Sequence, residues 1–136
     1  MGGPASLVAQ ALSGGAQTVL STGMINFTLA GGVLAWIEGT TSVNAQGIST
    51  TTITGLKASN SGGTVTTISP TSSATLYGVS GGHVVYGLQN KLYDWNATTA
   101  ASSLLVDTLP SLVMISGNTL YFTLGSSQTV YQLTLH

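Results

Sequence analysis

The chain has 136 residues, which is enough for one domain with a buried core. Only 4% of the residues are charged and the formal net charge is −1, so nucleic acid is a poor candidate partner, because counterion release needs several Lys or Arg contacts to phosphates. No apolar run approaches the roughly 18–20 residues of a membrane helix, so we expect no membrane span.

The first part of the chain predicts short strands joined by glycine-rich turns. Leu7–Leu12 and Gln17–Thr22 are apolar segments on either side of a glycine pair, the spacing of a hairpin. Ile25–Ala30 alternates apolar and polar residues, as a half-buried strand does, and Val33–Glu38 returns after a second glycine pair.

The next stretch is less regular. Thr50–Leu56 predicts a strand and Lys57–Gly63 predicts a polar loop. Thr64–Ser69 predicts another strand, which Pro70 ends because proline cannot donate to a ladder.

The clearest pattern runs from Thr75 to Thr108, with a tight turn predicted at Gln89-Asn90. It predicts four strands: Thr75–Ser80, His83–Leu88, Lys91–Trp95 and Ser102–Thr108. The last part predicts three more: Leu112–Ser116, Thr119–Leu124 and Thr129–Leu135. We find no convincing amphipathic helix.

These segments repeat. A phrase of glycine, then glycine or asparagine, any residue, Leu or Val, any residue and an aromatic begins at Gly31, Gly81 and Gly117. Alignment of the copies makes two sets of residues equivalent: Phe27, Tyr77 and Val113, and Leu29, Val79 and Ile115. The predicted units are 1–23 (a partial unit of two strands), 24–70, 71–110 and 111–136 (a partial unit of three strands).

A four-stranded antiparallel unit that recurs about every 40 residues is typical of a β-propeller blade. The phrases Gly82–Tyr86 and Leu92–Trp95 resemble blades of the bacterial TolB-like and YncE-like propeller families. The resemblance covers most of residues 24–136 and implies an all-β fold of about three blades. A single-chain β-sandwich is the alternative.

About three blades do not close a ring, because propellers typically need four to eight. Two open apolar flanks would remain, so we expect a protein partner or self-association, such as a dimer that completes a six-bladed ring. Strand sharing is one route, in which a partner's Gln17–Thr22 completes the unit that ends at Thr129–Leu135.

Residues that could carry chemistry are few. Gly78–Gly82 fits the G-x-S-x-G pattern around Ser80, but the residues from His83 onward alternate as a strand, so we interpret it as a turn. Glu38, Asp94 and Asp107 are expected to be solvated or to cap turns. The sequence has no metal site and no phosphate-binding loop, so we expect no cofactor.

Aromatic residues are the remaining candidates for binding. Tyr93 and Trp95 alternate with Asp94, so Asp94 should face the side opposite the two rings. If Trp95 is exposed beside Asn96, it is suited to stack on a sugar or to anchor a partner, and Trp36 occupies a related position.

These observations predict a non-enzymatic β-repeat module for protein binding or assembly. The alternative is a carbohydrate-binding, lectin-like module whose ligand-binding residues are Trp95, Asp94, Asn96 and Trp36. Low charge and strands rich in Thr, Ser and Gly favour an extracytoplasmic bacterial location, and no signal peptide is predicted within the sequence as numbered.

Overall fold

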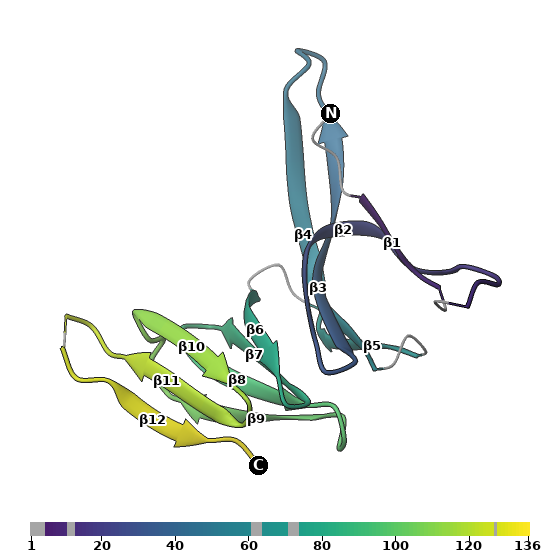
Figure 1. Ribbon diagram of the computed structural model, residues 1–136. Coiled ribbons are helices and arrows are strands. Elements are labelled where there is room, and N and C mark those ends of the chain that lie inside the picture. The colour runs from purple at the N-terminus through teal and green to yellow at the C-terminus, as the bar shows by residue number, and fades with distance from the viewer. Residues whose placement is uncertain (1–4, 11–12, 61–63, 71–73, 127) are drawn as a thin grey trace.

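The fold is all-β, as predicted. A computed structural model describes residues 5–10, 13–60, 64–70, 74–126 and 128–136. These residues form antiparallel sheets of five, four and three strands, which follow one another in chain order (Figure 1). No helix among them has the length and apolarity that crossing a bilayer requires.

The first sheet has strand order β1-β2-β3-β4-β5. Its strands are β1 (Ala5–Ala9), β2 (Thr18–Ala30), β3 (Val33–Val43), β4 (Ser49–Asn60) and β5 (Val65–Ser69). The second sheet contains β6 (Thr75–Ser80), β7 (His83–Leu88), β8 (Lys91–Asn96) and β9 (Ala101–Val106), and the third contains β10 (Leu112–Ser116), β11 (Thr119–Thr123) and β12 (Tyr131–Thr134).

The separation of Gln17–Thr22 from Ile25–Ala30 is a wrong prediction, because a single strand, β2, runs through both. The N-terminal half of β2 pairs with β1, and its C-terminal half pairs with β3 from Met24 opposite Glu38 onward. A bulge between Met24 and Asn26 lets the strand bend where it changes partner. The first sheet thus combines residues from two of the predicted units.

The predicted loop Lys57–Gly63 is also wrong in its first part. Lys57 to Asn60 continue β4, where Lys57 lies opposite Trp36 and Ala58 opposite Ala35. Polar composition suggested a loop, but β3 and β5 pair with this segment on both sides. Residues 61–63 of that prediction, and residues 11 and 12 of the predicted strand Leu7–Leu12, lie outside the described residues.

The second sheet follows the predicted meander closely. Its two tight turns have positive φ at both central residues, +57° and +82° at Gly81-Gly82 and +52° and +66° at Gln89-Asn90. These values are typical of type I′ turns, whose twist matches that of the flanking strands.

Strand register tests the predicted equivalences. Leu29 lies opposite Leu34, Val79 opposite Val84 and Ile115 opposite Leu120, so this set does occupy one repeat position. Tyr77 is a wrong assignment. A bulge between Leu76 and Gly78 places Leu76 opposite Tyr86, the register of Phe27 with Trp36, and turns Tyr77 to the other face.

Two apolar cores hold the sheets together. Ala35 and Ile37 of β3 pack with Val84 and Tyr86 of β7 between the first and second sheets. Val85, the residue between those two on β7, packs with a different set that includes Leu120 of β11, between the second and third sheets. The second sheet is therefore packed against a neighbouring sheet on both faces, while each of the other two has a neighbouring sheet on one face.

Candidate functional site

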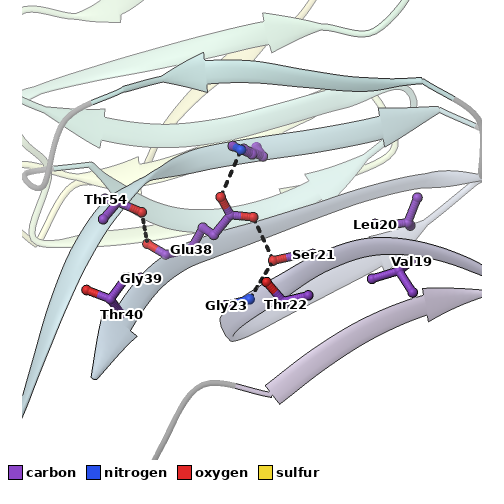
Figure 2. A pocket seen from close by; sticks show the side chains of 10 residues that line it. Val19, Leu20, Ser21, Thr22, Gly23, Glu38, Gly39, Thr40 and Thr54 are labelled. Atoms are coloured by element: carbon purple, nitrogen blue, oxygen red, sulfur yellow. Dashed lines mark hydrogen bonds and ion pairs between the residues drawn. The ribbon is translucent and has the colours of Figure 1, made fainter. Parts of the chain in front are cut away.

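The β1–β2 and β3–β4 hairpins of the first sheet diverge (Figure 1), and a polar cleft lies between them (Figure 2). Among the described residues, the part of β2 that precedes Met24 pairs only with β1, and the part of β3 that follows Glu38 pairs only with β4. The cleft between them has a volume of about 400 Å³. At its base Gly23 and Gly39 lie so close that the Gly39 carbonyl oxygen occupies the space of a Cβ on Gly23.

Glu38 forms the floor of this cleft, and its carboxylate is fully engaged (Figure 2). Oε2 accepts hydrogen bonds from Ser21 Oγ at 2.6 Å and Trp36 Nε1 at 3.2 Å, while Lys57 Nζ lies 2.8 Å from Oε1. Burial acts to raise the pKa of Glu38, but hydrogen bonds from Lys57, Ser21 and Trp36 together hold it below its ordinary value of 4.5. This carboxylate is thus ionised and held in place by donors, which suits a structural role.

A second polar cluster is buried between the second and third sheets. His83 Nδ1 lies 2.9 Å from Asp94 Oδ2 and 3.0 Å from Oδ1, and the two residues are 3% and 6% exposed. Burial raises the pKa of Asp94 above its ordinary value of 3.8, and His83 partly offsets this effect. The expectation that Asp94 is solvated or caps a turn is therefore wrong, because it lies in an inter-sheet core beside a cavity of about 270 Å³.

Asp94 does face the predicted side of β8. Tyr93 and Trp95 pack in the core between the first and second sheets, whereas Asp94 lines a cavity with residues of the third. Ser80 lies opposite His83 across the Gly81-Gly82 turn, and a strand follows. The strand-to-helix turn of a nucleophile elbow is not present there.

Charged groups in the described residues occur in three pairs. Besides Glu38 with Lys57 and Asp94 with His83, Lys91 Nζ lies within 2.6 Å of Asp107 Oδ1. Each acid is thereby paired with one Lys or His side chain on a neighbouring segment. No group of three or more His, Asp or Glu residues in the described part of the chain is placed to hold a metal ion.

The predicted binding residues do not form one site. Trp36 is 0% exposed and Trp95 is 4% exposed, so neither ring is available to stack on a ligand in this structure. Trp36 lies on the outer side of the first sheet with Glu38, whereas Trp95 lies in the core on its other side. Asn96 Oδ1 accepts hydrogen bonds from the Thr98 and Thr99 amides, which makes Asn96 a turn residue.

Several of the most exposed apolar side chains lie instead on the two ends of the stack. On the first sheet, Phe27 and Leu29 are 54% and 62% exposed, and we call this pair the β2 outer face. On the third sheet, Leu112, Met114 and Tyr121 are 69%, 72% and 39% exposed, and we call them the β10–β11 outer face. The alternation in Ile25–Ala30 predicts that Phe27 and Leu29 share one face of the strand, but it predicts that this face is packed within the chain.

Comparisons of the chain with protein-family models, with curated proteins and with solved structures found no match in any of the three.

Proposed function

We propose that the chain is a non-enzymatic β-repeat module that binds or assembles with protein partners through the apolar faces at the two ends of its stack. The observation that carries this proposal is the exposure of Phe27, Leu29, Leu112 and Met114, each more than half open to solvent. Contiguous exposed apolar surface of this kind marks interaction sites in folded proteins. Residues that face the opposite way on the same strands, such as Ile115, are packed in the cores.

The polar clusters support a role without catalysis. Glu38 is paired with Lys57 and Asp94 with His83, and the two acids lie on strands of different sheets. Hydrolysis by paired carboxyl groups needs two of them across one bond, with their pKa values driven apart for that purpose. Both clusters instead join neighbouring strands of one sheet.

Carbohydrate binding through Trp95 and Trp36 is not favoured. Stacking on a sugar requires an accessible ring face, and both indoles are buried. Asn96, the polar group expected beside them, already uses its side chain within the chain, where its Nδ2 donates to the His136 carbonyl at 2.9 Å.

The proposal is tested by removing the exposed apolar groups while keeping the strands. A variant with Phe27→Thr, Leu29→Thr, Leu112→Thr and Met114→Thr retains residues that are suited to strands. At high concentration, the wild-type protein should sediment with a mass above that of the monomer. If it is monomeric, it should instead bind the dye ANS, which reports exposed apolar surface. The variant should do neither.

A matched control removes apolar surface elsewhere. Val43→Thr and Ile48→Thr change residues that are 66% and 60% exposed near the tip of the β3–β4 hairpin, which projects away from the stack (Figure 1). This control should behave as the wild type. The proposal is wrong if the four-site variant, with an unchanged far-ultraviolet circular dichroism spectrum, sediments and binds the dye as the wild type does.

A further inference from the structure

The residues of the β2 outer face occupy a repeat position that is buried inside the stack. Leu29 lies opposite Leu34 on the first sheet, and Val79 lies opposite Val84 at the same register on the second. Val79 and Val84 are 5% and 0% exposed because the first sheet covers them. The β2 outer face is therefore the kind of surface that a preceding sheet covers elsewhere in this chain.

The β10–β11 outer face occupies the complementary position. Met114 lies opposite Tyr121, as Gly78 lies opposite Val85 on the second sheet. Val85 is fully buried against the third sheet, and a Cβ on Gly78 would lie 2.9 Å from Ile115 Cγ2 of that sheet. The β10–β11 outer face is therefore the kind of surface that a following sheet covers elsewhere in this chain.

Both interfaces within the stack combine one surface of each kind. Ala35 of the first sheet packs in one core with Val84 of the second, and Val85 of the second packs in the other with Leu120 of the third. We infer that a second copy of this chain is the partner, with the β10–β11 outer face of one copy packed against the β2 outer face of the next. This inference rests on the proposed function and names its partner.

The packing is head to tail, because the two faces in contact differ. A symmetric contact would place like surface on like surface, which neither interface within the chain does. Head-to-tail contacts close into a ring if the rotation between copies permits it, and they form open filaments otherwise. Two copies in a closed ring would bring together six sheets, since each copy has three.

Face packing replaces the strand exchange that the sequence suggested. Thr18 and Ser21, within the predicted donor segment, already pair with Ala9 and Leu7 of β1 in the same sheet. The outer faces need no such rearrangement. They carry apolar side chains. In the described part of the chain each Lys, Asp and Glu side chain already has a partner, so packing these faces together would not bury an unpaired charge.

Two single-face variants separate this inference from its alternatives. The first carries Phe27→Thr and Leu29→Thr and keeps only the β10–β11 outer face. The second carries Leu112→Thr and Met114→Thr and keeps only the β2 outer face. Size-exclusion chromatography with light scattering should give monomer mass for each variant alone and twice that mass for an equimolar mixture, because one intact interface forms only between different variants.

Three outcomes would overturn the inference. Self-association of either single-face variant at wild-type strength would indicate a symmetric contact. A mixture that stays monomeric while the wild type associates would exclude the head-to-tail pairing of these faces. A wild type that is monomeric at every concentration but binds ANS would remove the second copy as partner, and the proposed function would stand with a different protein.

Discussion

Glu38 and Asp94 differ in how their surroundings act on their charge. Glu38 receives three donors, Ser21, Trp36 and Lys57, and its pKa is lowered although burial opposes this. Burial raises the pKa of Asp94, and its one side-chain partner, His83, only partly offsets this. More donors and less complete burial keep Glu38 ionised, whereas deeper burial with a single partner raises the pKa of Asp94.

Glu38 should contribute to stability above pH 4.5 and lose that contribution under acid. Because its pKa is lower in the folded than in the unfolded protein, the contribution is complete above the ordinary value of 4.5 and declines as the pH falls through the folded pKa. The Glu38→Gln variant should show a flatter decline of the free energy of unfolding below pH 4.5 than the wild type. Urea titrations at several pH values measure this.

Asp94→Asn is the matched comparison, for which the pH dependence of the stability contribution should have the opposite sign. The pKa of Asp94 is raised by folding, so its contribution is greatest below its ordinary value of 3.8 and declines as the pH rises through the folded pKa. The stability difference between wild type and Asp94→Asn should thus grow toward low pH, whereas that between wild type and Glu38→Gln should shrink. Parallel slopes for the two variants would contradict this assignment.

At the scale of residues, the sequence predicts which face of a strand a side chain points to better than it predicts whether that side chain is buried. Alternation along β8 correctly placed Asp94 opposite Tyr93 and Trp95, because side-chain direction depends only on the local strand. The exposure of Trp95 depends on β3 and β4, which lie far away in the sequence and cover it. Local patterns contain no information about that covering sheet.

At the scale of elements, the turn at Gly81 joins β6 to β7 in the second sheet, the turn at Gly117 joins β10 to β11 in the third, and the two turns lie against each other. Gly81 has φ +57°, and a Cβ there would meet Asn118 Oδ1 and lie 2.8 Å from the Gly117 carbonyl oxygen. Gly117 has nearly the same φ, +56°, with nothing within 4 Å of a Cβ. The two glycines share a backbone conformation and differ in crowding.

Gly81→Ala should therefore destabilise the protein more than Gly117→Ala does. Both substitutions place alanine in the left-handed region, at a cost of about 1 kcal/mol. Only Gly81→Ala adds overpacking between the two turns, for about 1–3 kcal/mol more. Denaturant unfolding measures both values, and Gly31→Ala, with φ +57° and open space, provides a second control. Equal losses at Gly81 and Gly117 would show that the turns do not pack together.

The sequence predicts elements well where each strand begins and ends at a turn. The strands of the second sheet lie between such turns, and their predicted bounds differ little from those observed. Prediction from sequence fails where one strand pairs with two partners along its length, as β2 does, or where a bulge shifts the register, as at Tyr77. Bulges are set by how a strand meets its neighbours, so composition does not reveal them.

At the scale of the whole molecule, the second sheet links the other two. Val84 and Val85 are neighbours on β7, are both 0% exposed, and point to opposite faces of the sheet. Val84 packs in the core shared with the first sheet and Val85 in the core shared with the third. One strand thus contributes to both interfaces, and the two sides can be perturbed separately with the same substitution.

Val84→Ala and Val85→Ala should weaken different halves of the protein. Each removes the same two methyl groups from a packed core, at a cost of about 2 kcal/mol. Hydrogen exchange followed by mass spectrometry should show faster exchange in β3 and β4 for Val84→Ala, and in β10, β11 and β12 for Val85→Ala. Local opening follows the contacts that are lost, because sheets that keep their packing retain protection. If both variants accelerate exchange equally throughout the chain, the three sheets unfold as one unit and the two cores are not separable.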